Sequence, residues 1–374
     1  MKKLRKIFIL GTLMGSAVGI IIPISNVHLF NMGLSTNVAG WITALYFFAM
    51  ILGSKIYNKF IGKFQVYQFV VIALFLSATA TIGFVLCKEI ILWAFFIFII
   101  GIGVSFNFIT IQSYLNQSEV EKKTSTTGIY AFCYAVGFAI SVTLGPILYE
   151  KSKYLAFVSA ACLMFLDASI IFVFKLKINL KKEEAARLSI EKVFPFLTGG
   201  FVYGFIENAM TAFYTIYLLE FYTLKHAGVI LSFFLAGGML GIIPLTYFSD
   251  KTGLVKSCLI YAFFASIGMI LILCTNYKIH FSSITGAFLG SLYPITLAGL
   301  NYVGLEKEQL IKATSYYTIS YSLGSTLGPI IAGYIMSLLG GNGLLISCIF
   351  LLIIFIVTIV LSVINKWILL ERND

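Results

Sequence analysis

Residues 175–192 read KLKINLKKEEAARLSIEK, the longest polar stretch in the chain. Six apolar runs precede it and six follow it, most of them about 20 residues long, the length a helix needs to cross a bilayer core of about 30 Å. We therefore expect an all-α polytopic membrane protein with twelve transmembrane helices in two pseudo-symmetric six-helix halves. The predicted boundaries are residues 1–176 for the first bundle, 177–192 for a cytoplasmic linker and 193–374 for the second bundle.

The composition excludes a soluble protein. Of 374 residues, 60% are hydrophobic and 11% are charged, with a mean hydropathy of +0.98, so polar side chains are too few to cover a soluble globule. The runs also lack the alternation of a transmembrane barrel. The predicted spans are 7–30, 36–57, 65–87, 90–115, 124–148, 154–174, 194–219, 226–248, 257–275, 280–303, 313–338 and 344–365.

The net charge of +11 predicts topology rather than nucleic-acid binding. If the N-terminus is cytoplasmic, most of the 26 Lys and Arg residues fall on the cytoplasmic side of the predicted spans. This asymmetry is what the positive-inside rule requires when both termini are cytoplasmic. The basic residues that remain for the outer loops are Lys88, Lys151, Lys153, Lys225 and Lys278.

Matching elements in the two halves indicate an internal repeat, which is common in transporters. The alternative is chance, because Gly and Pro are frequent in membrane helices. The Gly-Pro pairs in the two halves are 183 positions apart. The fifth and eleventh spans contain Tyr134-x-x-Gly137 followed by Gly145-Pro146, and Tyr321-x-x-Gly324 followed by Gly328-Pro329.

Two six-helix halves joined by a basic loop resemble the major facilitator superfamily. That family carries Gly-x-x-x-Asp-Arg/Lys-x-Gly-Arg/Lys after the second and eighth spans, and Asp250-Lys251-x-Gly253 matches its second copy. At the first copy, Gly53 and Gly62 remain but the aspartate is missing. The resemblance implies a cytoplasmic latch in which the acid engages a neighbouring helix end and helps to hold the outward-open state. Alternatively, Asp250 only caps a turn.

The resemblance extends to small bacterial permeases of this superfamily, through residues 204–208, 290–294 and 320–329. Gly145-Pro146 and Gly328-Pro329 also resemble the Gly-Pro element of proton-coupled antiporters, although ordinary helix packing explains such pairs equally well. In the fourth span, this group often has Glu-Ser where the present chain has Gln112-Ser113. The resemblance implies a bacterial inner (cytoplasmic) membrane protein.

Ionisable groups inside hydrocarbon are costly, so their positions are functional hypotheses. Of 15 acidic residues, only Glu207 and Asp167 lie well inside a predicted span. Glu207, beside Asn208, is the candidate proton carrier; alternatively it is a structural acid bonded to a neighbouring helix. For Asp167 we favour a structural role, reaching a cytoplasmic cavity or pairing with a snorkelling lysine. His28 titrates in a useful range, but near the interface we expect it to be solvated.

Further polar side chains are candidates for a midplane cavity, although each one alone more often bonds a neighbouring helix. All Lys and Arg residues fall in loops or at span ends, which leaves no buried cation for an anionic solute. We therefore expect a neutral, zwitterionic, cationic or amphiphilic organic substrate. The additional candidates are Asn107, Gln112, Asn116, Tyr134, Tyr293, Tyr317 and Tyr321.

Together these features predict a proton-coupled transporter that works by alternating access, with export as the favoured direction. The alternatives are a proton-independent facilitator or channel, or a lipid-translocating protein. A membrane enzyme has no support, because the sequence shows no metal constellation, nucleophile motif or cofactor signature. We expect no cofactor and no metal. The expected partners are the solute, protons and the lipid bilayer, with the protein acting as a monomer.

Overall fold

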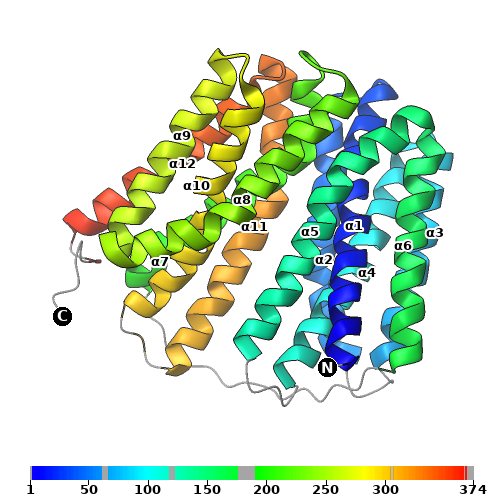
Figure 1. Ribbon diagram of the computed structural model, residues 1–374, viewed down its shortest axis with the longest axis horizontal. Coiled ribbons are helices and arrows are strands. Elements are labelled where there is room, and N and C mark those ends of the chain that lie inside the picture. The colour runs from blue at the N-terminus through cyan, green and yellow to red at the C-terminus, as the bar shows by residue number, and fades with distance from the viewer. Residues whose placement is uncertain are drawn as a thin grey trace. The chain divides into compact units, whose positions relative to one another are not determined.

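The computed structural model describes residues 2–60, 66–117, 123–175, 190–303, 305, 307–365 and 367–368. Within these residues the chain forms twelve long helices (Figure 1) and no strand. The helices are α1 (Lys2–Asn31), α2 (Thr36–Phe60), α3 (Val66–Leu86), α4 (Ile90–Gln117), α5 (Lys123–Lys151), α6 (Lys153–Phe174), α7 (Ile190–Leu218), α8 (Leu224–Thr252), α9 (Leu254–Cys274), α10 (Lys278–Tyr302), α11 (Lys307–Leu339) and α12 (Gly343–Ile364).

Eleven of these helices are long and apolar enough to cross a membrane. The exception is α7, which has 29 residues and carries Glu207 and Asn208. The predicted all-α polytopic fold is therefore confirmed.

The chain divides into two compact units. The first contains Met1–Lys182 together with Phe221–Gly228, and the second contains Glu183–Glu220 and Val229–Asp374. The segment Phe221–Gly228 groups with the first unit because it packs on the end of α5, where the Lys225 backbone N–H donates to Glu150 Oε1 at 2.9 Å. Most of the predicted linker at 177–192 lies outside the described residues.

The core of the first unit is the close contact between α1 and α5. A methyl group added at Gly15 would lie 2.0 Å from the Tyr134 carbonyl oxygen, and one at Gly137 would lie 2.3 Å from the Thr12 carbonyl oxygen. Without glycine at these positions the two backbones could not approach so closely.

The second unit repeats this contact between α7 and α11. A methyl group at Gly204 would lie 2.3 Å from the Tyr321 carbonyl oxygen, and one at Gly324 would lie 2.0 Å from the Phe201 carbonyl oxygen. Gly15 and Gly204 thus occupy equivalent positions on α1 and α7, and Tyr134 and Tyr321 do so on α5 and α11. The contacts therefore relate α1 to α7 by a shift of 189 residues and α5 to α11 by a shift of 187 residues.

This register corrects the Gly-Pro correspondence that the sequence suggested. At the shift of 187, the counterpart of Gly145 is Ala332, one helical turn beyond Gly328. The two glycines also pack differently. Gly328 faces the backbone of Phe205 on α7, whereas Gly145 faces the side chain of Ile24 on α1. The two Gly-Pro pairs therefore do not occupy equivalent positions.

Candidate functional site

The candidate site is centred on the Glu207 carboxyl group, about midway along α7. The Tyr321 hydroxyl on α11 donates a hydrogen bond to Glu207 Oε2 at 2.8 Å, and Tyr203 interacts electrostatically with the same carboxyl group. The Glu207 side chain keeps partial exposure. A carboxyl group that accepts a hydrogen bond from a phenol and is still partly accessible can exchange a proton while that donor stays in place.

Aromatic rings surround this carboxyl group. Tyr203 lies 5.2 Å from Tyr293 and 6.0 Å from Tyr321, measured between ring centroids. Tyr293 lies 5.7 Å from Tyr321 and 5.6 Å from Tyr317. Tyr293 is 37% exposed, whereas Tyr317 is buried. We call these four tyrosines and Glu207 the tyrosine–glutamate cluster.

Helical spacing brings the members of the cluster together. Tyr203 and Glu207 are four residues apart on α7, and Tyr317 and Tyr321 are four apart on α11, so each pair shares one helix face. The close approach at Gly204 then brings the two faces together. The sequence candidates Glu207, Tyr293, Tyr317 and Tyr321 meet here, joined by Tyr203.

The Tyr317 hydroxyl fixes α11 against α10. It donates to the Tyr293 carbonyl oxygen at 3.0 Å and also contacts Thr296 Oγ1 at 2.8 Å. Thr296 was not among the sequence candidates. Threonine is common in membrane helices, so the residue type alone did not point to Thr296. Only its position three residues after Tyr293 would have suggested it.

Asn208 does not join Glu207 in a hydrogen-bonded pair. Its Nδ2 donates to the Gly204 carbonyl oxygen and to Ser325 Oγ, both at 2.9 Å, and its side chain is only 7% exposed. The first bond is within α7, and the bond to Ser325 ties α7 to α11 one turn beyond Gly204. Asn208 therefore stabilises the helix pair that holds Glu207, and its partner Ser325 could not be recognised from the sequence.

In the first unit, two candidates form a separate buried pair. Asn107 Nδ2 on α4 donates to Asp167 Oδ2 on α6 at 2.6 Å, and both side chains are fully buried. The expectation that Asp167 reaches a cytoplasmic cavity or pairs with a lysine is wrong among the described residues. Its partner is an amide, because α6 turns this side chain toward the interior of the bundle.

His28 is buried and not solvated, contrary to expectation. Its side chain is 2% exposed, and Nδ1 lies 2.9 Å from the Tyr149 hydroxyl. The rings of Phe157, Trp93 and Phe84 lie within 6.3 Å of the imidazole. Aromatic side chains from four helices close this position, which sequence spacing alone does not reveal.

The remaining midplane candidates lie elsewhere in the first unit. The Tyr134 ring packs 4.9 Å from the Phe108 ring. Gln112 and Asn116 belong to α4, but their side chains lie outside the described part of the chain.

Of the second-copy latch residues, Asp250 and Lys251 lie in the last turn of α8, and Gly253 connects α8 to α9. The Asp250 side chain is exposed and makes no hydrogen bond or ion pair with another described residue. Lys251 Nζ lies 4.7 Å from the centre of the Tyr247 ring. Gly253 turns the chain with φ of 88°, a left-handed conformation that favours glycine. These residues form the α8–α9 turn.

The first copy of the latch motif is only partly described. Gly53 is buried, and a methyl group there would lie 2.9 Å from Ser105 Oγ on α4. This contact gives Gly53 a packing role. Gly62 lies outside the described residues.

One basic residue departs from the expectation that cations stay exposed. Lys278, at the start of α10, is 2% exposed. Its Nζ donates to the Ile272 carbonyl oxygen at 2.6 Å and to the Tyr217 hydroxyl at 3.0 Å. The ammonium group thus holds the α9–α10 turn and is not presented to a solute.

No group of three His, Cys, Asp or Glu side chains that could hold a metal ion occurs in the described ranges. The six cysteines are free thiols.

Two units of six helices, with an accessible carboxyl group among the helices of the second, define a membrane transporter fold. The family model of the Major Facilitator Superfamily matches residues 7–303 and 196–372. The chain belongs to this family.

The relatives and solved structures that resemble the chain agree with this assignment. The chain is 22% identical to the uncharacterized MFS-type transporter YfkF of Bacillus subtilis (strain 168), over 88% of this chain and 87% of the relative. It is also 22% identical to the MFS-type transporter YcaD of Salmonella enteritidis PT4, over 88% of each protein.

Two solved structures share the fold. A bacterial homolog to the human lysosomal transporter Spinster, inward-facing and unoccupied, matches with a TM-score of 0.75 at 13% identity, over 97% of this chain and 95% of that one. The nucleoside transporter NupG matches with a TM-score of 0.78 at 10% identity, over 96% of this chain and 99% of that one.

Proposed function

We propose that the protein is a proton-coupled secondary transporter that moves a small organic solute by alternating access of its two six-helix halves, in the direction of export. The observation that carries this proposal is the tyrosine–glutamate cluster. A partly exposed carboxyl group that accepts a hydrogen bond from Tyr321 and lies among tyrosine rings combines the properties of a proton carrier with those of a solute contact.

The charge around the cluster supports a neutral, zwitterionic, cationic or amphiphilic solute. Recognition of a strongly anionic solute would require a buried cation with free donors. Lys278 is the buried lysine in the described part of the chain, and its ammonium group is engaged at the α9–α10 turn. The tyrosine faces, in contrast, suit aromatic, apolar or cationic groups.

Asp250 belongs to the proposed cycle as the acid of a cytoplasmic latch. Its exposure and its lack of a described partner are compatible with an acid that engages a helix end in another conformation. The proposal includes a multi-pass protein of the bacterial inner membrane with both termini in the cytoplasm. The protein would act as a monomer, without a cofactor.

The experiment that tests this function begins with the solute. Metabolite pools of cells that lack and cells that overproduce the protein identify candidate solutes, which are then loaded into proteoliposomes with and without a pH gradient. We expect the gradient to drive solute flux in the wild type and the variant Glu207→Gln to lose this driven flux. Glu191→Gln, which changes an exposed acid on the same helix, is the matched control.

The outcome also separates the alternatives. Flux that runs only downhill and is equal in wild type and Glu207→Gln would remove proton coupling and favour a facilitator or channel. Redistribution of labelled lipid between the leaflets of solute-free proteoliposomes would favour a lipid-translocating protein.

A further inference from the structure

The Asn107–Asp167 pair in the first unit is an unusually complete burial of a carboxyl group. Both side chains have no exposed surface, and the hydrogen bond between them measures 2.6 Å. The pair joins α4 to α6. It is distinct from the tyrosine–glutamate cluster, which lies in the second unit.

Each member of the pair has one oxygen atom without a partner. Asn107 Oδ1 and Asp167 Oδ1 are buried and accept no hydrogen bond from a described residue. If Asp167 were ionised, both atoms would be acceptors and could not pair with each other. An unsatisfied buried acceptor is costly, and more so when it is charged.

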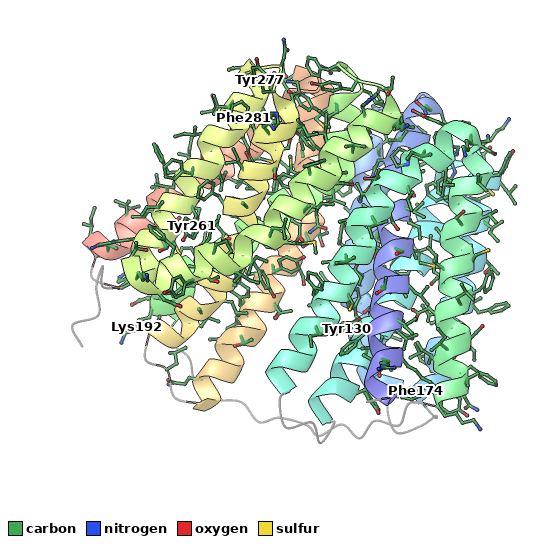
Figure 2. All side chains as sticks on the ribbon, in the orientation of Figure 1. Tyr130, Phe174, Lys192, Tyr261, Tyr277 and Phe281 are labelled. Atoms are coloured by element: carbon green, nitrogen blue, oxygen red, sulfur yellow. The ribbon has the colours of Figure 1, made fainter. Side chains whose placement is uncertain are left out.

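The surroundings of Asp167 offer no positive charge among the described residues. Tyr130, which Figure 2 labels, is an ionisable residue on α5 that interacts electrostatically with Asp167. On α1, Arg5 and Lys6 are exposed near the start of the helix, and Lys6 Nζ lies 5.2 Å from the ring of Phe174.

Further ionisable groups on the surrounding helices contact other side chains, and Tyr134 on α5 packs on Phe108. His28, at the far end of α1, contacts Tyr149. Tyr67 on α3 packs on Phe172. A buried carboxylate without a cation is strongly disfavoured relative to its neutral form. The lack of a nearby cation and the two unpaired acceptors therefore both favour the neutral form of Asp167.

We propose that Asp167 and Asn107 form a second proton-binding site, in which a protonated Asp167 pairs with the Asn107 amide. The amide Nδ2–H donates to Asp167 Oδ2, as observed, and the carboxyl Oδ1–H donates back to Asn107 Oδ1. One proton thus satisfies both unpaired oxygen atoms and removes the buried charge. The proposal does not depend on the role of Glu207.

Tyr130 completes the site. Its hydroxyl is buried and has no hydrogen-bond partner among the described residues. When the proton leaves, this hydroxyl is the donor that can turn to the Asp167 carboxylate and replace the lost bond. The first unit then has its own titratable centre, and proton release is coupled to a rearrangement where α4, α5 and α6 meet.

Infrared spectroscopy of the full-length protein in liposomes tests this site, with the proton as the only ligand. At pH 7 we expect a C=O stretching band of a protonated carboxyl group that persists in Glu207→Gln, disappears when Asp167→Asn is added to Glu207→Gln, and changes frequency when Asn107→Leu is added instead. The band in Glu207→Gln reports on Asp167 even if Asp167→Asn does not fold.

Two results would overturn the proposal. One is the absence of any protonated carboxyl band from Glu207→Gln at pH 7. The other is a band that Asn107→Leu leaves unchanged in frequency. Neither result affects the flux test of Glu207, so this site and the proposed transport function can fail separately.

Discussion

The α1–α5 contact of the first unit and the α7–α11 contact of the second share their packing and differ in their chemistry. Glycine faces a tyrosine carbonyl oxygen in both, at Gly15 and at Gly204. At the position equivalent to Glu207, however, the first unit has Val18, which is 4% exposed. The buried acid described in the first unit is Asp167 on α6, away from this contact. The repeat has kept the geometry of close packing while the ionisable groups have diverged.

The largest expected effect tests whether the packing is truly shared. Gly15→Ala and Gly324→Ala would each place a methyl group 2.0 Å from a carbonyl oxygen of the facing helix. We expect each to lower stability by about 3 kcal/mol or more, since a backbone cannot move aside as a side chain can. Thermal unfolding of the purified protein, followed by intrinsic fluorescence, measures the effect.

Gly238→Ala is the control for this comparison. Its new methyl group would come no closer than 3.3 Å to any neighbour outside its own helix, while the helix gains from the removal of glycine. Because 3.3 Å from the Gly286 carbonyl oxygen is still a tight contact, we expect a small loss of stability, well below that of Gly15→Ala or Gly324→Ala. If Gly15→Ala or Gly324→Ala matched this control, the close contact in that unit would not be essential.

A carboxyl group moved into the first unit tests whether the chemistry has diverged. Val18→Glu places an acid where the first unit has Met14 in place of Tyr203, so one neighbouring phenol is lacking. At pH 8 we expect it to be about 2–3 kcal/mol less stable than Val18→Met, a variant of similar size without the acid.

The pH dependence of Val18→Glu gives a second readout. The penalty should shrink at pH 5, because a protonated carboxyl group has no charge to bury. Thermal unfolding at the two pH values measures this difference. An equal penalty at both values would mean that the first unit can solvate the charge, which would contradict the comparison.

Tyr321→Phe tests the hydrogen bond between Tyr321 and Glu207 in the second unit. It removes the hydroxyl that donates to Glu207 Oε2 and leaves the ring in place. We expect a loss of about 1–2 kcal/mol, since a partly buried acceptor loses a partner. Tyr334→Phe changes an exposed tyrosine of the same helix and should have almost no effect on the unfolding temperature.

The smallest loss of stability is expected at Asn208, one helical turn beyond the Gly204 contact. The equivalent residue of the first unit is Gly19. We expect Asn208→Ala to cost about 1 kcal/mol through its hydrogen bonds to Gly204 and Ser325. A double-mutant cycle with Ser325→Ala should show a coupling of at least 0.5 kcal/mol, as found for contacting residues. Purely additive losses would show that this bond does not join the helices.

Hydropathy, charge placement and the polar stretch at 175–192 were enough to predict the helical membrane fold, because each helix satisfies its own backbone hydrogen bonds and must be apolar toward lipid. The same reasoning identified Glu207 and Asp167, since a charge inside a span is conspicuous. It failed for neutral partners such as Thr296 and Ser325, whose types are common in any membrane helix.

The sequence by itself therefore determined that the chain is a bundle of membrane helices with two deep acids. Only the tertiary structure decided which side chains surround those acids. It placed Glu207 among tyrosines, paired Asp167 with Asn107 and shifted the Gly-Pro pairs out of register. The physical reason is that helix periodicity sets which residues share a face, whereas close packing at glycines sets which faces meet.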